Sequence, residues 1–228
     1  MNERYTRNIG AVTQSEQELL WAKKAVVIGC GGLGCYAAEF LARLGLGNLT
    51  LIDGDVFAES NLNRQLYSLE TNLGKPKAAE AKNRLLQVRS NMYIEVFEKY
   101  LNEENAGELL KGHDIIIDAL DNVKTRLLVE KTACSLGIPI VHGAVEGWCA
   151  QICTVFPGDF ILSALFSNSR EYKNPSVLAF TPAFCASIQA AEAVKVLLGR
   201  KNILRMKLLT VNLMENTFDI IELEHNSF

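Results

Sequence analysis

Residues 24–34 read KAVVIGCGGLG, and this stretch decides the fold. Its first half is a short apolar run of the kind that forms a buried strand, and its second half fits the pattern G-x-G-x-x-G. Glycines in such a turn let the backbone approach a phosphate closely, and the helix N-terminus that follows favours negative charge. We expect a nucleotide here rather than a tight turn without a ligand, with the phosphates against Gly29, Gly31, Gly32 and Gly34.

Strands and helices alternate in the residues that follow. Residues 33–44 are apolar at helical spacing and stop at Gly45, and residues 49–53 form a second strand that ends on Asp53. A carboxylate at this place is positioned to accept hydrogen bonds from ribose hydroxyls. Further helices are expected at residues 76–89, 106–110 and 123–136, and further strands at residues 93–98, 114–118 and 138–142. The pattern predicts a Rossmann-like α/β sheet that is mostly parallel.

The pattern changes after Val145. Residues 149–156 and 206–223 are predicted strands without long helices between neighbours, which indicates an antiparallel C-terminal extension of the sheet. Residues 159–179 show few regular signals, and Thr181-Pro182 is expected to cap a long apolar helix that ends at Gly199. We predict one domain over residues 1–228, made of an N-terminal arm (1–24), a nucleotide-binding half (25–142) and a second half (143–228).

Composition narrows the class of protein. The 228 residues are 49% hydrophobic and 21% charged, as in globular proteins, and a net charge of −3 argues against nucleic-acid binding through bulk electrostatics. No apolar run is long enough to span a bilayer, and the polar N-terminus is unlike a signal peptide. These features predict a cytoplasmic protein whose six cysteines are thiols, and the absence of a C-x-x-C pair gives no support to a zinc site.

Charged and amide side chains follow the strand ends, where open α/β sheets bind ligands. They are Asn61, Arg64, Lys77, Asp121 and Asn122. A triphosphate needs arginine, lysine and Mg²⁺ to offset its charge, whereas a dehydrogenase needs no such set. Each signal is modest alone, since Arg64 and Lys77 are also typical of solvated surfaces and Asp121 is also suited to capping the next helix.

Together these motifs resemble the MoeB/ThiF/HesA family, bacterial relatives of the ubiquitin-activating enzymes. The resemblance rests on the glycine loop, Asp53, NLNRQ at 61–65, GKPK at 74–77 and Asp121-Asn122, with RYTRNI at 4–9 and closing strands at 208–223. It implies ATP-dependent adenylation of the C-terminal glycine of a small ubiquitin-like sulfur-carrier protein ending in Gly-Gly, with release of pyrophosphate. Thiamine, molybdopterin, tungstopterin and cysteine pathways all use this chemistry within the family.

The resemblance also implies roles for individual residues. Asp53 holds the ribose, Asn61, Arg64 and Lys77 neutralise the triphosphate beside Asn122, and Asp121 binds Mg²⁺. Arg7 resembles an arginine that each subunit of a homodimer contributes to its partner's site. The half at 143–228 would contain a crossover loop and bind the carrier.

The chain departs from the family at its cysteines. Ile161 and Ala164 stand where many relatives place a zinc-binding C-x-x-C pair, and Tyr172 aligns with the cysteine of the crossover loop. We therefore expect neither zinc nor a thioester or persulfide step on this loop. Cys185, in an apolar helix, is expected to be a buried structural thiol, and Cys149 and Cys153 are expected to pack in a core. His142 is expected to be a hydrogen-bonded structural residue.

Three other functions stay open at this point. A nicotinamide-dependent oxidoreductase could use the same glycine loop, but the chain lacks a recognisable second catalytic domain. A scaffold without activity could bind nucleotide and a partner. An ATP-dependent enzyme could activate a carboxylate on a modified tRNA base, although the net charge of −3 makes RNA a poorer match.

Overall fold

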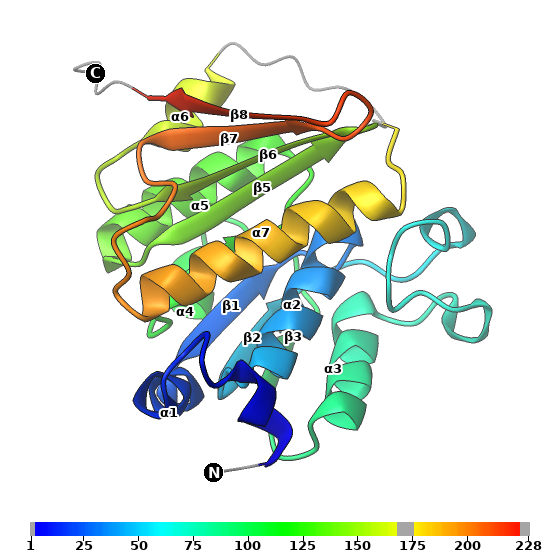
Figure 1. The fold of residues 1–228 in the computed structure, drawn as a ribbon. Helices are drawn as coiled ribbons and strands as arrows, with labels where there is room; N and C mark the ends of the chain where they lie inside the picture. Colours follow the sequence, from blue (N-terminus) through cyan, green and yellow to red (C-terminus); the bar gives the residue numbers. More distant parts are fainter. Residues whose placement is uncertain (1–2, 168–175, 224–228) are drawn as a thin grey trace.

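Eight strands form one sheet in the order β3-β2-β1-β4-β5-β6-β7-β8 (Figure 1). The structure is a computed structural model and describes residues 3–167 and 176–223. The parallel strands are β1 (Lys24–Ile28), β2 (Asn48–Ile52), β3 (Tyr93–Phe97), β4 (Ile115–Asp118) and β5 (Ile140–Glu146). The antiparallel strands are β6 (Cys149–Val155), β7 (Lys207–Asn212) and β8 (Thr217–Glu222). The predicted fold class, mostly parallel with an antiparallel C-terminal extension, is confirmed.

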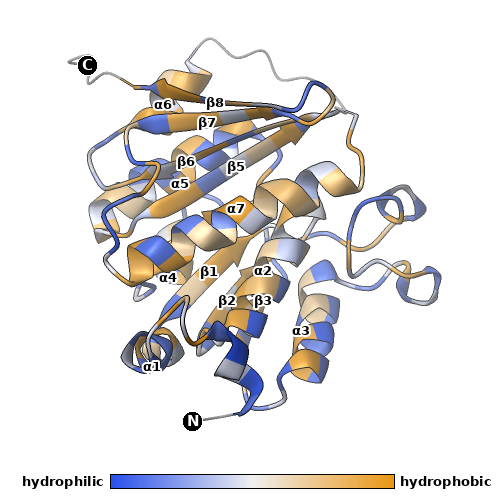
Figure 2. Ribbon diagram, viewed as in Figure 1, coloured by the Kyte–Doolittle hydropathy of each residue, from blue (hydrophilic) through white to orange (hydrophobic). Residues whose placement is uncertain are grey.

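Helices cover both faces of the sheet (Figure 1). One face lies under α2 (Gly32–Leu44), α3 (Lys77–Val88) and α7 (Phe180–Leu197), and the other under α4 (Ala106–Leu110), α5 (Val123–Leu136) and α6 (Ile161–Phe166). The strand β1 supplies Ala25 and Val27 to the first core and Val26 and Ile28 to the second. A strand buried on both faces is apolar at most positions, which explains the hydrophobic runs of the central strands (Figure 2).

Two helices that were not predicted lie in the segment interpreted as an N-terminal arm. The 3₁₀ helix η1 (Glu3–Asn8) buries Tyr5, and α1 (Gln14–Ala22) begins with a capping box formed by Thr13 and Glu16. The side chains of Asn8 and Gln17 donate hydrogen bonds to the carbonyl of Leu44, the last residue of α2 (3.3 and 2.8 Å). This segment therefore packs against the C-terminal end of α2.

Two expectations for the second half were wrong. Residues 161–166 form the helix α6, because the buried carboxylate of Glu130 accepts hydrogen bonds from the first-turn amides of Leu162 and Ser163 (2.7 and 2.8 Å). Thr181 does not cap α7, since Ala179 is the N-cap and the Thr181 hydroxyl donates instead to the carbonyl of Gly147 (2.8 Å).

None of the described helices combines the length and the apolar character that a membrane span requires.

The glycine loop is closed by a backbone contact that admits no side chain. A Cβ at Gly34 would lie 1.7 Å from the carbonyl oxygen of Gly29. Gly29 itself has a φ of +92°, and a Cβ there would lie 2.7 Å from the carbonyl oxygen of Ala119. Both glycines are therefore required by the fold, whether or not a phosphate is bound.

Replacing Gly34 with alanine is expected to destabilise the protein by about 3 kcal/mol, because the methyl group overpacks rigid backbone. The change is measured as a lower urea midpoint of unfolding. The matched control is Gly107→Ala in α4, where a Cβ meets nothing within 4 Å and helix propensity favours alanine. Equal midpoints for the two variants would contradict the steric argument.

Candidate functional site

Three loops meet at the carboxyl edge of the parallel strands. The loop after β1 carries the glycines, and its Cys30 amide donates to Asp53 Oδ2 just beyond β2 (2.6 Å). On the other side, the amide of Ala119, just beyond β4, donates to the carbonyl of Ile28 (3.1 Å). The glycine loop is thus held between the ends of β2 and β4, as predicted for a nucleotide site of this fold.

Asp53 belongs to a small polar cluster with Asp55, Lys77 and Tyr100. Its Oδ1 accepts from the amide of Asp55 (2.7 Å), and the two oxygens keep lone pairs for further donors. Burial raises the pKa of Asp53, and the hydrogen bonds from the Asp55 and Cys30 amides oppose that rise. Asp55 in turn accepts from Lys77 Nζ (3.1 Å) and from the hydroxyl of Tyr100. Partial burial works against ionisation of Asp55, but these bonds and the Lys77 charge lower its pKa overall.

The predicted residue Lys77 is therefore present at the site in an ion pair. Its side chain is largely buried, while Asp55 is half exposed. The sequence analysis missed Asp55 and Tyr100. Asp55 could have been found, because it is an acidic residue two positions after Asp53. Tyr100 could not, because it lies 45 residues beyond Asp55 in the sequence.

The NLNRQ run lies over the glycine loop. A Cβ at Gly32 would lie 3.7 Å from Arg64 Cγ, and a Cβ at Gly31 would lie 3.5 Å from Gln65 Nε2. Arg64 Nη1 donates to Ser60 O and Asn63 Oδ1 (2.8 and 2.9 Å), which keeps the guanidinium beside the loop. The run thus brings a permanent positive charge next to the N-terminus of α2.

Asn61 shapes this run from within. Its side-chain oxygen accepts from the Ala58 amide (2.9 Å), and its backbone carbonyl accepts from the amides of Arg64 and Gln65 (3.1 and 3.0 Å). Asn61 is buried, so part of its role in the structure is to hold the turn that carries Arg64.

Asp121 and Asn122 occupy the loop after β4, and they differ in role. The helix α5 is capped by Asn122, whose Oδ1 accepts from the Thr125 amide (2.9 Å). The alternative that Asp121 caps this helix is therefore wrong. Asp121 is exposed, and no described residue forms a hydrogen bond or ion pair with its carboxylate.

A carboxylate that bonds to no described residue at this edge suits Mg²⁺, which takes one or two protein carboxylates together with substrate phosphates. Within residues 3–167 and 176–223, no group of three or more His, Cys, Asp or Glu side chains converges on a metal position. The expectation of no zinc stays a prediction, and Tyr172 lies outside the described residues.

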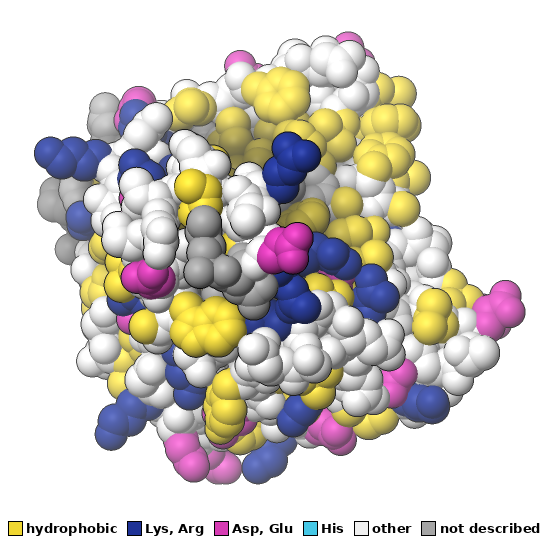
Figure 3. Space-filling view, turned by 60° about the horizontal axis from the view of Figure 1, so that its bottom comes forward, with side chains coloured by type: hydrophobic (Ala, Val, Ile, Leu, Met, Phe, Trp, Pro, Cys, Tyr) yellow, Lys and Arg dark blue, Asp and Glu magenta, His cyan; other side chains and the backbone are white. Residues whose placement is uncertain are grey.

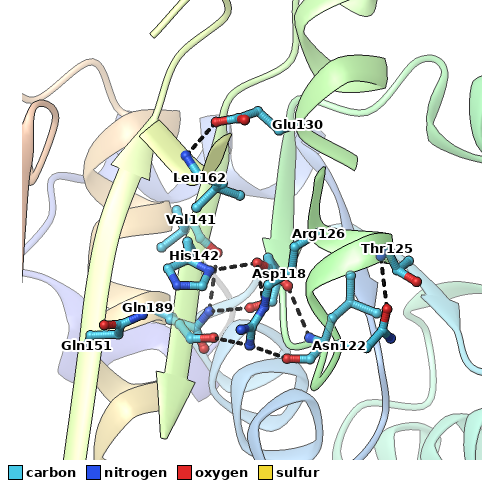
Figure 4. A network of polar contacts seen from close by, with 12 residues as sticks. Asp118, Asn122, Thr125, Arg126, Glu130, Val141, His142, Gln151, Leu162 and Gln189 are labelled. Carbon is cyan, nitrogen blue, oxygen red and sulfur yellow. Dashed lines mark hydrogen bonds and ion pairs between the residues drawn. The ribbon is translucent and has the colours of Figure 1, made fainter. Parts of the chain in front are cut away.

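A buried polar network behind this loop was not predicted (Figure 4). The carboxylate of Asp118 bonds to His142 Nδ1 (2.7 Å) and lies 3.5 Å from Arg126 Nε, and Gln189 Nε2 donates to the Asp118 carbonyl (2.9 Å). Burial works against the charge of Asp118, but Arg126 and His142 lower its pKa, and burial lowers the pKa of His142. An ionised carboxylate only accepts, so neutral His142 carries its proton on Nδ1. The expectation that His142 is hydrogen-bonded is confirmed, and its structural role stays a prediction.

Arg7 lies far from the glycine loop of its own chain. It is exposed on η1, next to Asn8, which bonds to the C-terminal residue of α2. The 13 residues of α2 separate that end from the glycine loop by roughly 20 Å at 1.5 Å per residue.

The cysteines follow the predictions with one exception. Cys185 and Cys153 are fully buried, and burial raises the pKa of Cys185 to about 12. Cys149 was expected in a core but is exposed, because it is the first residue of β6 and adjoins the turn at Gly147.

A Rossmann-like sheet with a glycine loop, the carboxylate of Asp53 and the cations of Arg64 and Lys77 at one edge is typical of a nucleotide-binding α/β protein. The model of the ThiF family matches residues 5–227, and the chain belongs to this family.

Curated relatives agree with this membership. The chain is 37% identical to the molybdopterin-synthase adenylyltransferase of Haemophilus influenzae, over 85% of this chain and 83% of the relative. It is 32% identical to the sulfur carrier protein adenylyltransferase of Thermus thermophilus, over 98% and 88%. Among solved structures, E. coli MccB with ATP superposes with a TM-score of 0.87 at 23% identity, over the whole of this chain and 72% of MccB, which supports the fold.

Thiol reactivity tests the burial of the cysteines. At pH 8 a thiol with a pKa of about 12 is ionised in roughly one molecule in ten thousand, so native Cys185 is expected to resist iodoacetamide while exposed Cys149 is alkylated. Peptide mass spectrometry measures both sites in one sample, and unfolding in urea should make them equally reactive. Alkylation of Cys185 in the native protein would show that the thiol is accessible.

Proposed function

We propose that this chain adenylates the C-terminal glycine of a small ubiquitin-like sulfur-carrier protein with ATP and Mg²⁺. The observation that carries the proposal is the meeting of the glycine loop with Asp53 on one side and Arg64 on the other. Membership of the ThiF family, with relatives named adenylyltransferases, supports the reaction class.

In the proposed reaction, a carboxylate oxygen of the carrier attacks the α-phosphorus of ATP. A bond forms between that oxygen and phosphorus, the bond from phosphorus to the oxygen that bridges to the β-phosphate breaks, and pyrophosphate leaves with the electron pair. No nucleophile from the enzyme is needed, so positioning and charge stabilisation can carry the step.

The chain's residues divide this task. Asp53 accepts hydrogen bonds from the ribose, Gly31 and Gly32 admit the phosphates to the N-terminus of α2, and Arg64 offsets their charge. Lys77 either adds to that charge or keeps Asp55 in place, since it pairs with Asp55 in the free protein. Asp121 would hold Mg²⁺, which would supply positive charge to offset the negative charge of the phosphates and the leaving pyrophosphate.

The position of Arg7 favours a homodimer. Because η1 packs at the far end of α2, Arg7 does not reach the glycine loop of its own chain. A two-fold axis would bring it to the partner's loop, and the same contact would be made twice.

The carrier is proposed to dock on the antiparallel side of the sheet. All six residues of β8 are exposed, and Phe218, Ile220 and Ile221 are each about half accessible. Hydrophobic side chains also gather along the top and right of the surface in Figure 3. Exposed apolar surface of this kind marks a site of protein interaction. Ser176 and Val177 bond to Gly147 and Asn63, which connects this side to the nucleotide loops.

A carboxylate on a modified tRNA base is the second candidate substrate. The apolar β8 favours a protein partner over RNA, whose backbone calls for a basic surface. A nicotinamide-dependent reaction would leave Arg64 and Asp121 without a role.

ATP–pyrophosphate exchange tests the proposed reaction. We expect exchange only when a carrier ending in Gly-Gly is added, and at least a hundredfold loss in Asp121→Ala, because the metal ligand is removed. Ser60→Ala, in the same run and exposed, keeps the backbone carbonyl that accepts from Arg64 and is the control for general disturbance of the loops. Tighter binding of NAD than of ATP, together with full exchange by Asp121→Ala, would disprove the assignment.

Mixing two inactive variants tests the shared site. Arg7→Ala and Asp121→Ala are each expected to be inactive alone, whereas a mixed dimer has one site with an intact body and an intact Arg7. Random reassortment should restore roughly a quarter of wild-type exchange, by the counting of a symmetric dimer. Subunit exchange is verified with differently tagged chains. No recovery in exchanged dimers would count against the shared site, and full activity of Arg7→Ala alone would remove this arginine from the reaction.

A further inference from the structure

The residue before Asp121 is held by both of its backbone polar groups. The Leu120 amide donates to Asp118 Oδ1 (3.0 Å), and the Leu120 carbonyl accepts from Arg126 Nη2. After Asp121, the cap formed by Asn122 fixes the start of α5. Both neighbours of Asp121 are therefore anchored, while its own carboxylate bonds to no described residue.

The two anchors of Leu120 belong to one buried ion pair. Asp118 is fully buried and Arg126 is 6% exposed, with Asp118 Oδ2 and Arg126 Nε 3.5 Å apart. Taking such a pair out of water costs several kcal/mol per ion, and apolar residues of similar volume often serve stability as well or better. Stability alone therefore does not account for an ion pair at this place.

The remaining contacts of Asp118 fix its orientation. His142 Nδ1 bonds to Oδ2 (2.7 Å), and Gln189 Nε2 bridges the carbonyls of Asp118 and Val141 (2.9 and 3.2 Å). Figure 4 shows these side chains converging on Asp118 from α5, β5 and α7. Arg126 Nη2, which donates to the Leu120 carbonyl, also donates to the Gly143 carbonyl (3.3 Å), so two backbone carbonyls hold the guanidinium beside Asp118.

We propose that Asp118 and Arg126 are positioning residues that place the Asp121 carboxylate for Mg²⁺. The inference rests on the proposed function, since it concerns the metal position of that site. The planar fork of Arg126 uses two nitrogens: Nη2 donates to the carbonyls of Leu120 and Gly143, and Nε forms the ion pair with Asp118. The single ammonium of lysine cannot occupy both places. Loss of the fork frees the Leu120 carbonyl and lets the loop that carries Asp121 move.

Metal affinity in Arg126→Lys tests this role without relying on activity. We expect the dissociation constant for Mn²⁺, measured by electron paramagnetic resonance with a non-hydrolysable ATP analogue, to rise about tenfold or more, as for other residues that orient metal ligands. Amide hydrogen exchange at Leu120 should be slow in the wild type and faster in the variant. The wild-type exchange rate is informative even if the variant fails to fold.

Arg89→Lys is the matched control. Arg89 is also a buried arginine bonded to a backbone carbonyl, that of Leu46, but it lies at the end of α3. The substitution Arg89→Lys should lower the midpoint temperature of thermal unfolding without changing the affinity for Mn²⁺.

Three results would overturn the inference. One is unchanged Mn²⁺ affinity in Arg126→Lys when Asp121→Ala abolishes binding. Another is an equal loss of affinity in Arg89→Lys, and the third is fast exchange of the Leu120 amide in the wild type. Wild-type Mn²⁺ binding by Asp121→Ala would instead disprove the metal site of the proposed function, and the role of the ion pair with it.

Discussion

The nucleotide edge of this protein depends on the contact between the Gly29 carbonyl and the α-carbon of Gly34. Only with hydrogen at Gly34 does the chain turn sharply enough to begin α2 directly after β1. The same turn brings Gly29 against Ala119 and the Cys30 amide against Asp53. Because β2, β1 and β4 are parallel neighbours, the residues that follow each strand then converge on one place.

The parallel half of the fold could be predicted because burial on both faces leaves a simple sequence pattern. Strands such as β4 are apolar up to their last residue, and glycines such as Gly45 and Gly137 end the helices. The helix α6 could not be predicted, since its first turn is stabilised by Glu130, more than thirty residues away. By contrast, α1 was missed although its capping box at Thr13 and Glu16 is visible in the sequence.

The candidate site was predictable where a motif fixes the spacing. Arg64 lies at the glycine loop because NLNRQ is a compact turn, and its exact neighbours follow from that turn. The network around Asp118 could not be predicted, because its partners come from three other elements, up to 71 residues away in the sequence. Gln189, in the largely apolar α7, was an available signal, whereas Arg126 is one of several charged residues of α5 and gave none. Cys149 was misplaced because strand parity does not say how far along a strand the covering layer extends.

The length of α2 also sets how catalysis would scale with the amount of protein. If each site needs an arginine that its own helix holds roughly 20 Å away, an isolated chain is incomplete however well it folds. Turnover per chain then rises with concentration until association is saturated, by mass action. In the proposed homodimer, the rigid helix α2 would thereby make activity sensitive to expression level, and dilution alone would silence the enzyme.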